Sequence, residues 1–475
     1  MASTIHQAIV IATKTTPMDG RQRPLGEVKA GGVTLLKRAL LTLAGKGVNR
    51  FSIVVADESV RDRVADDPKL TGLELQWVLN DTRASEDGFS VLQAAEGVVG
   101  DFLVVPADRV FSPDIAAQLT ERRRDGVTLA VAAHTTDAID ASDPPLTLPN
   151  GETFVGLLTA DQSLLDALAA REASGGPVML HTVLSDFVAA DRLATVDIGS
   201  EYCLAVTDKA SRAKADSVLL KALGKSVDGL VARHVNRVFS LAVTRVLRNT
   251  WVRPNHVTGV SLGAAAVGAV AAAQATVAEP WWLIVGALFW QLASMLDGVD
   301  GELARLKFMG SKFGEWFDTL SDDIGRLLVF TGSGIGAAAV FGSQLWLVLT
   351  ALTVTIQIGT SVPVYRKLLQ SGSGSHYALA WEGDSKTTLW TRFKASLGFF
   401  SRRDSYIAIW LGFALVGQLK IAIVLNFIVT MFVLANELLS PRQARAGFVQ
   451  QRAAKAVPAN ARPANTQPAR SSLAA

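Results

Sequence analysis

The sequence has almost no cysteine, and its charges of opposite sign nearly cancel. Cys203 is the single cysteine among 475 residues, so an internal disulfide framework is excluded and a reducing compartment is expected. The formal net charge at pH 7 is only +3, which is too small to predict a nucleic-acid partner. The opening residues, MASTIHQAIVIATKT, lack the basic start of a secretory signal peptide. We therefore expect the N-terminal half to stay in the cytosol.

Long hydrophobic runs are missing from the first half of the chain. Residues 1–225 instead alternate short apolar runs, such as QAIVIAT and DFLVVPAD, with helical patterns. This alternation predicts an α/β domain with a doubly wound, mostly parallel sheet. Residues 137–152 are predicted to form a loop, because turn-forming residues replace any periodic pattern there.

A basic, amphipathic segment follows at residues 226–253. Four arginines share it with an apolar set, and the members are Arg233, Arg237, Arg245 and Arg248 with Val235, Phe239, Leu241, Val243 and Leu247. This pattern predicts a juxtamembrane helix that lies along an anionic membrane surface. A solvated linker helix is the alternative.

Residues 254–440 carry the long apolar segments and predict an all-α membrane domain with six spans. The expected spans are 257–277, 281–303, 318–341, 344–365, 405–418 and 419–438. Lysine and arginine gather in the connections on one side, so the positive-inside rule predicts a multi-pass protein of the inner membrane with both termini in the cytosol. Residues 441–475 are rich in Ala, Pro, Arg and Gln and are predicted to be disordered.

Carboxylates are concentrated between the second and third expected spans, in the stretch MLDGVDGELARLKFMGSKFGEWFDTLSDD at 295–323. Asp297 and Asp300 are three residues apart, and Asp318 and Asp322 are four apart, so each pair shares one helix face. Two antiparallel spans would bring these carboxylates together. Because like charges repel in a partly desolvated cleft, we expect Mg²⁺ or Mn²⁺ there, as a two-metal site suited to phosphoryl transfer.

An acidic interfacial loop with solvated charges is the alternative to a metal site. It is disfavoured because a carboxylate deep in a span costs about 2.5–3.5 kcal/mol on insertion scales. The neighbouring residues also fit phosphate chemistry. Gly301 and Gly314 allow close approach of a ligand, Ala304 keeps one helix face open, and Arg305 can pair with a phosphate.

The spacing D-x2-D-G-x2-A-R-x8-G-x3-D-x3-D resembles the signature of the CDP-alcohol phosphotransferases. The segments VRPNHVT at 252–258 and SRRDSY at 401–406 resemble those that enter the family's first and fifth spans. The resemblance implies a homodimer in which an acceptor hydroxyl attacks the β-phosphorus of a CDP-linked donor and CMP leaves. The implied roles are metal ligation by Asp297, Asp300, Asp318 and Asp322, general base catalysis by Asp322, and a CDP pocket formed by Gly301, Ala304, Arg305 and Gly314.

Basic residues near the carboxylates could hold the phosphate of an acceptor. The candidates are Lys307, Lys312, Arg326, Arg366 and Arg403. For each one alone, positive-inside topology is a sufficient alternative explanation.

The first 225 residues resemble sugar-phosphate nucleotidyltransferases, and the whole chain resembles bifunctional inositol-phosphate cytidylyltransferase/di-inositol-phosphate-phosphate synthases. The loop ATKTTPMDGRQRPLGEVKAGG departs from that family, because its first glycine is Gly20 and Leu25 follows Pro24 where a lysine is expected. We therefore expect cytidylyltransferase activity to be lost and the domain to be kept for binding or assembly. Asp108 and Asp197 match the family's metal aspartates, with helix or turn capping as the alternative, while Lys14, Arg21, Arg23 and Lys29 could compensate for the loop.

Two donors fit the implied reaction. CDP-diacylglycerol would make the product a phospholipid, whereas CDP-inositol with inositol phosphate as acceptor would make a polar phosphodiester. An ion-coupled transporter is an alternative of another class, but it would require carboxylates near mid-span and inverted repeats. A nucleotide-binding scaffold is a further alternative, and it has no need of a general base beside two metals.

Overall fold

The structure is a computed structural model that describes residues 5–18, 21–122, 126–142, 144–224, 235–371, 374 and 403–439. The chain forms two compact units. The first comprises Met1–Asp228, Phe239–Pro254 and Val299–Gly310, and the second comprises Gly229–Val238, Asn255–Gly298 and Ser311–Ala475. The tail at 441–475, predicted to be disordered, lies outside the described residues.

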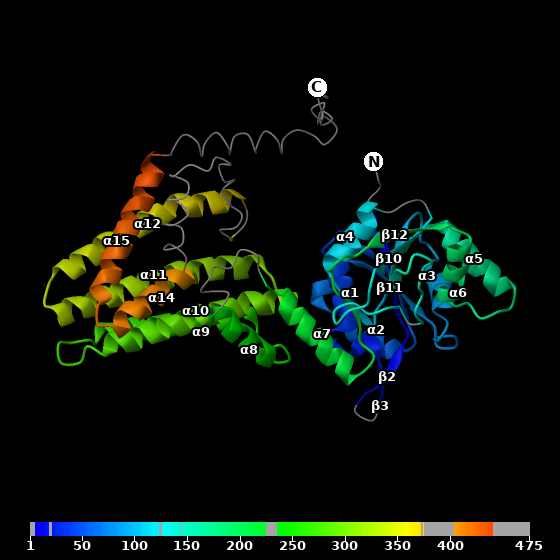
Figure 1. Cartoon of the computed structure of the whole chain (residues 1–475), viewed down its shortest axis with the longest axis horizontal. Helices are drawn as coiled ribbons and strands as arrows, with labels where there is room; N and C mark the ends of the chain where they lie inside the picture. The colour runs from blue at the N-terminus through cyan, green and yellow to red at the C-terminus, as the bar shows by residue number, and fades with distance from the viewer. Residues whose placement is uncertain are drawn as a thin grey trace, which may run out of the picture. The chain divides into compact units, whose positions relative to one another are not determined.

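A seven-stranded sheet forms the centre of the first unit (Figure 1). Its order is β12 (Leu193–Asp197), β10 (Val127–Ala132), β11 (Thr153–Ala160), β8 (Phe102–Pro106), β1 (Gln7–Ala12), β6 (Arg50–Val55) and β7 (Glu74–Leu79). β11 runs antiparallel to both of its neighbours, while the remaining adjacent strands pair in parallel. The prediction of a doubly wound, mostly parallel sheet is confirmed.

Helices cover both faces of this sheet. One layer contains α1 (Leu35–Ala44), α2 (Glu58–Val64) and α4 (Pro113–Arg122), and the other contains α3 (Asp87–Ala94), α5 (Gln162–Ala173) and α6 (Leu180–Ala189). Side chains alternate along a strand, so Val10 of β1 joins the first apolar cluster and Ile9 and Ile11 join the second. Burial on both sides explains why the strands are continuous apolar runs.

Short elements complete the first unit. They are β2 (Thr15–Met18), β3 (Arg21–Pro24), η1 (Leu25–Glu27), β4 (Lys29–Ala30), β5 (Val33–Thr34), η2 (Pro68–Leu70), β9 (Arg109–Phe111), β13 (Cys203–Ala205) and α7 (Lys209–Ala222). Among the described residues of 137–152 there is no helix, and only isolated bridges form at Ile139 and Thr147. The loop predicted there is confirmed.

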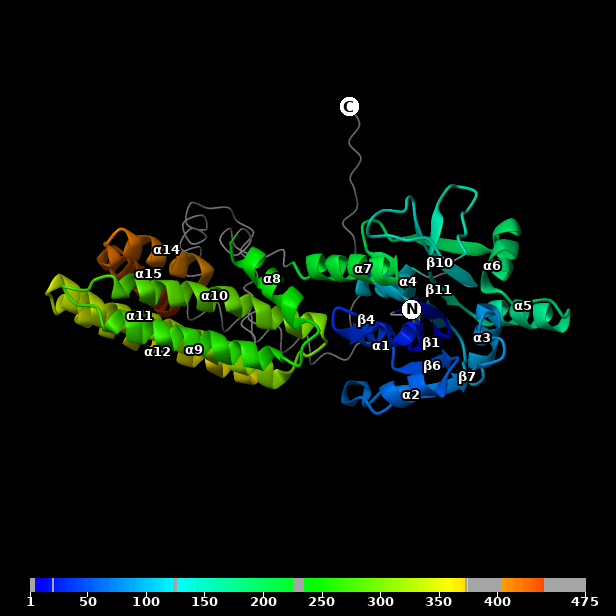
Figure 2. The same ribbon diagram turned by 90° about the horizontal axis from the view of Figure 1, so that it is seen from below.

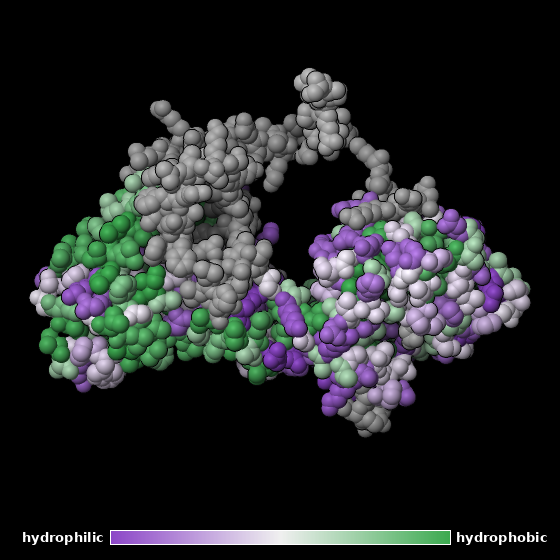
Figure 3. All heavy atoms as spheres, viewed as in Figure 1, coloured by the Kyte–Doolittle hydropathy of each residue, from purple (hydrophilic) through white to green (hydrophobic). Residues whose placement is uncertain are grey.

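The helical region contains α9 (Pro254–Ala273), α10 (Trp282–Leu306), α11 (Lys312–Phe341), α12 (Leu345–Ser371), α14 (Arg403–Leu415) and α15 (Leu419–Leu439). Figure 2 shows α9, α10, α11 and α12 running along one another, and hydrophobic side chains gather on the surface of these helices in Figure 3. Four helices of the described part, α9 to α12, are long and apolar enough to cross a membrane. Six spans are therefore not confirmed, because α14 has only 13 residues and the apolar part described for α15 ends at Ala435.

The predicted juxtamembrane helix ends at Leu247 rather than at residue 253. Within the segment 226–253 the structure describes α8 (Arg237–Leu247), and residues 225–234 lie outside the described part. α8 buries the hydroxyl residues Ser240 and Thr244, whereas Val238 and Val246 are exposed. Sequence periodicity did not reveal this polar buried face. The location of α8 on a membrane surface stays a prediction.

Close approach of α9 and α11 depends on glycine. A Cβ atom built on Gly332 would lie 2.7 Å from Ala269 Cα, whereas one built on Gly359 of α12 meets nothing within 4 Å. We expect Gly332→Ala to lower the free energy of unfolding by about 1–3 kcal/mol, because the two backbones must separate.

The matched control is Gly359→Ala, which should leave the free energy of unfolding unchanged or raise it by about 0.5–1 kcal/mol through helix propensity. Thermal and denaturant unfolding of both variants in detergent measures the difference. Equal stability of the two variants would contradict the close packing of α9 against α11.

Candidate active site

Two helices carry the carboxylates that the sequence singled out. Asp297 and Asp300 lie in the last three turns of α10, and Asp318 and Asp322 lie in the first three turns of α11. Ser311 caps α11 by accepting a hydrogen bond from the Gly314 amide at 3.0 Å. The connection between the helices is short, and Phe308 takes a left-handed backbone conformation with φ of 52°, which ends α10 and turns the chain back.

Three of the four carboxylates converge. Asp297, Asp300 and Asp318 each offer an oxygen within 4.8 Å of the others. Asp300 is only 6% exposed, and the other two are half-buried. Charges of one sign this close and this poorly solvated repel each other strongly unless a cation neutralises them. An all-carboxylate donor set fits a hard divalent ion such as Mg²⁺ or Mn²⁺.

The fourth carboxylate is joined to this cluster through an arginine. Arg403 Nη1 donates a hydrogen bond to Asp297 Oδ1 at 2.5 Å and another to Asp322 Oδ1. Asp322 therefore lies beside Asp297, and one guanidinium bonds both carboxylates. The sequence predicts only a phosphate-binding role for Arg403, because no local pattern records its contact with the aspartates.

Polar side chains lie close to both glycines of the signature, Gly301 and Gly314. A Cβ atom on Gly301 would lie 3.3 Å from Arg305 Nη1, and one on Gly314 would lie 3.2 Å from Asn255 Oδ1. Arg305 is exposed and Ala304 is half-buried on the same turn. Asn255 was not singled out as a site residue, although it belongs to VRPNHVT, which was already noted for its resemblance.

The five basic candidates have different surroundings. Lys307 is 3% exposed, and its ammonium donates to the carbonyls of Leu247, Thr250 and Val252, so it is occupied by the fold. Lys312 and Arg366 are exposed. Arg403 and Arg326 are partly buried among the helices. Arg403 pairs with Asp297, and Arg326 lies near Asp323.

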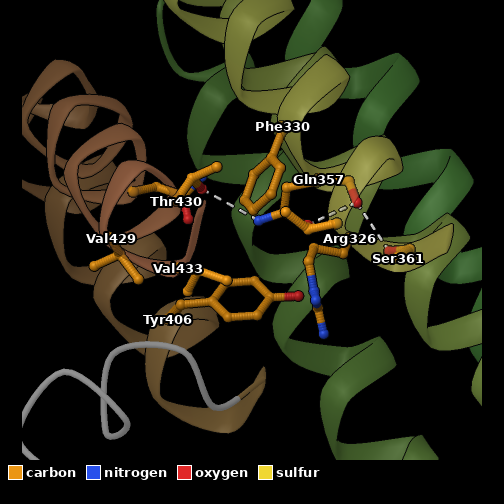
Figure 4. Close-up of a pocket in the computed structure, with 10 residues that line it drawn as sticks. Arg326, Phe330, Gln357, Ser361, Tyr406, Val429, Thr430 and Val433 are labelled. Carbon is orange, nitrogen blue, oxygen red and sulfur yellow. Dashed lines mark hydrogen bonds between the residues drawn. The ribbon is translucent and has the colours of Figure 1, made fainter. Parts of the chain in front are cut away.

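A pocket of about 90 Å³ beside α11 is lined by Arg326 together with residues of α12, α14 and α15. Figure 4 shows the polar ends of Arg326 and Tyr406 turned toward one another across it. On its far side Gln357 Nε2 donates a hydrogen bond to Thr430 Oγ1 at 3.3 Å. Arg326 Nη1 lies 3.8 Å from Asp323 Oδ1. The pocket thus combines one cationic side chain with neutral polar groups.

The segment after β1, where a nucleotide-binding loop is expected, does not form a glycine-rich loop. After β1 the chain forms the β2–β3 hairpin, and Leu25 is buried in an apolar cluster, so it cannot face a phosphate. Lys14 Nζ lies 3.1 Å from Asp108 Oδ2. An ammonium group thus neutralises the carboxylate expected to bind metal.

The other candidates of this unit make local contacts or are exposed. Asp197 is exposed and accepts a hydrogen bond from the Gly199 amide at 2.9 Å, as the turn-capping alternative predicts. Arg23 and Lys29 are exposed. The side chain of Arg21 lies outside the described part.

The carboxylate cluster predicts a measurable cation site. In full-length protein, Asp300→Asn and Asp318→Asn should each weaken Mn²⁺ binding by at least about tenfold, because each removes a charged ligand from the set. Electron paramagnetic resonance of free Mn²⁺ measures the affinity. Glu279→Gln is the control, since Glu279 is exposed in the connection between α9 and α10. Equal affinities in all three variants would exclude a cation at the cluster.

Comparison with known proteins matches two families to separate parts of the chain. Residues 251–449 match the CDP-alcohol phosphatidyltransferase family, and residues 9–190 match the MobA-like NTP transferase domain. Two relatives carry the name "Bifunctional IPC transferase and DIPP synthase". The protein from Rubrobacter xylanophilus is 29% identical over 333 residues, which cover 67% of this chain and 74% of the relative. The protein from Thermococcus kodakarensis is 25% identical over 377 residues, which cover 76% and 83%.

A solved structure described as the inositol-1-phosphate CTP transferase from T. maritima is also similar. It has a TM-score of 0.39 and 17% sequence identity, and the superposition covers 46% of this chain and 98% of that chain.

Proposed function

We propose that this chain, a CDP-alcohol phosphotransferase with a MobA-like NTP transferase domain ahead of its CDP-alcohol phosphatidyltransferase domain, makes an inositol phosphodiester. In this reaction it transfers a phosphoinositol group from a CDP-linked donor to an inositol phosphate and releases CMP. The names of the relatives from Rubrobacter xylanophilus and Thermococcus kodakarensis support this choice of substrate class.

The convergence of Asp297, Asp300 and Asp318 within 4.8 Å is the observation that carries the proposal. These carboxylates would hold Mg²⁺ or Mn²⁺, and Asp322 would share in ligation. When bound, divalent ions supply electrostatic stabilisation to a reacting pyrophosphate. Gly301, Ala304 and Gly314 would leave room for the donor, and the exposed Arg305 would pair with one of its phosphates.

The chain's own groups would bring the acceptor to the donor and take its proton. Arg403 and Arg326 would bind the acceptor's phosphate, which orients its free hydroxyl. The hydroxyl oxygen attacks the β-phosphorus, a new phosphorus–oxygen bond forms, and the bond from that phosphorus to the CMP oxygen breaks. The hydroxyl proton passes to the carboxylate of Asp322, the general base.

A lipid donor, CDP-diacylglycerol, is the second candidate, and one observation favours it. The ion pair of Lys14 with Asp108 and the buried Leu25 leave the N-terminal domain poorly suited to bind a metal-bound triphosphate. A chain that makes no CDP-inositol of its own has less reason to use it as donor.

The helical region is a membrane domain, as its four long apolar helices and its family both indicate. We place it in the inner membrane with both termini in the cytosol, as the distribution of lysine and arginine predicts. A homodimer is proposed from the resemblance to the family.

An assay of CMP release decides between the donors. Purified full-length protein with Mg²⁺ or Mn²⁺ should release CMP from CDP-inositol when inositol phosphate is present. CDP-diacylglycerol with inositol, inositol phosphate or glycerol phosphate should give none. Turnover with the lipid donor alone would replace the proposed substrate class, and no turnover with either donor would remove the phosphotransferase assignment for this chain.

Loss of the base should act on the chemical step. We expect Asp322→Asn to lower kcat by about 10²–10⁴-fold, because the amide cannot accept the hydroxyl proton. Single-turnover CMP release measures this, with Glu279→Gln as the control of unchanged rate. If Asp322→Asn kept the full rate, another group would be the base.

A further inference from the structure

The division between the two units falls inside helix α10, between Gly298 and Val299. The residues after that point, Val299–Gly310, cluster with the α/β unit, although they belong to the carboxylate signature. They include Asp300, Gly301, Ala304 and Arg305. The last two turns of α10 are therefore packed as part of the first unit, and the contacts that fix them there determine where Asp300 lies.

A buried arginine of the α/β unit caps the C-terminal end of α10. Arg38 of α1 is 5% exposed, and its Nη2 donates to the Leu306 carbonyl at 2.8 Å and to the Ala30 carbonyl at 2.9 Å. The last carbonyls of a helix lack partners within the helix, and a cation there also opposes the negative end of the helix dipole. Burial lowers the pKa of Arg38 to about 10, so the guanidinium remains charged at pH 7.

Two lysines fix the residue that follows α10. Lys69 of η2 donates from Nζ to the Lys307 carbonyl at 2.8 Å. The ammonium of Lys307 in turn donates to the carbonyls of Leu247, Thr250 and Val252 at distances of 2.9–3.1 Å. The end of α10 is thus joined to η2 on one side and to the end of α8 on the other.

Helix α8 is itself tied to both α10 and α7. Glu302 of α10 is fully buried and accepts hydrogen bonds from Ser240 and Thr244, each at 2.6 Å. Asp216 of α7 accepts from Arg248 Nη2 at 3.0 Å and from the Gly31 amide at 2.6 Å. A buried carboxylate with two strong donors is costly to disturb.

We propose that the α/β unit positions the Asp300–Arg305 segment of the phosphotransfer site, and that Arg38 is a positioning residue that acts through the last turn of α10. The inference rests on the proposed function, because it assigns the segment to that reaction. This positioning role of the α/β unit would require neither a loop that binds a nucleotide nor metal binding by Asp108. Without the cap the last turn would fray, and Asp300, six residues before Leu306, would lose its fixed place beside Asp297 and Asp318.

Hydrogen–deuterium exchange tests the positioning role without relying on activity. In full-length Arg38→Gln, the amides of Lys307, Phe308 and Met309, which bond to carbonyls of the last turn of α10, should exchange about tenfold faster, as loss of a charged hydrogen bond predicts. Mn²⁺ affinity should also fall about tenfold, because loss of this hydrogen bond would leave Asp300 less firmly held. Arg38→Lys keeps the charge and one donor, so it should restore part of both properties.

The matched control is Arg61→Gln, which removes an exposed arginine from α2 of the same unit and should change neither property. Unchanged exchange and unchanged Mn²⁺ affinity in folded Arg38→Gln would overturn the proposal. If Arg38→Gln does not fold, Lys69→Met removes the partly buried contact to Lys307, and the same two readouts decide. Wild-type protein that releases no CMP would instead overturn the proposed function, and CMP release that Arg38→Gln leaves unchanged would overturn the positioning role alone.

Discussion

Mutual repulsion among Asp297, Asp300 and Asp318 is the constraint on which the helical site depends. Three carboxylates within 4.8 Å of one another would separate if their backbones were free to move, so the surrounding fold must hold them in place. The two aspartates of α10 are fixed relative to each other by helix geometry, and Asp318 is fixed by a helix whose first turn is capped by Ser311. Arg403 adds a positive charge at the edge of the cluster by bonding Asp297 and Asp322.

Because their carboxylates repel one another, α10 and α11 must be held firmly by the rest of the fold. α11 approaches α9 so closely that Gly332 has no room for a Cβ atom, and α10 is held along its length by polar contacts from outside the helix. Asn236 donates to Ser294 and accepts from Gln291 at 3.0 Å each, and Glu302, two residues after Asp300, binds α8. Buried polar contacts of this kind specify one register of packed helices, because any other register leaves a polar group unpaired.

Local patterns in the sequence predicted the parts of this structure that depend on local rules. Strand and helix periodicity predicted the doubly wound sheet. The spacing of Asp297, Asp300, Asp318 and Asp322 predicted that all four would meet, and the first three share one cluster. The family resemblance drawn from that spacing is confirmed by the match of residues 251–449.

Contacts between distant residues could not be predicted in this way. Arg403 meets Asp297 across 106 residues and Arg38 meets Leu306 across 268, and no periodicity records such a pairing. Lys307 was a candidate phosphate ligand because of its charge. Its burial and its hydrogen bonds to backbone carbonyls depend on distant residues, so the sequence did not reveal them.

The α/β unit combines a sheet that is buried on both faces with a first loop that makes specific contacts of its own. Its sheet buries continuous apolar strands on both faces, and the segment between β1 and α1 adds Leu25, Val28 and Ala30 to a separate apolar cluster. That segment forms the β2–β3 hairpin, and Lys14 forms an ion pair with Asp108. Gly31 and Gly32 at the end of the segment and Arg38 of α1 contact Asp216, Arg248 and Leu306. Gly32 has φ of 80°, and a Cβ atom there would collide with the Arg248 carbonyl, so glycine is required on both conformational and steric grounds. Backbone geometry is thus strictly constrained where this segment meets the end of α8 and the end of α10.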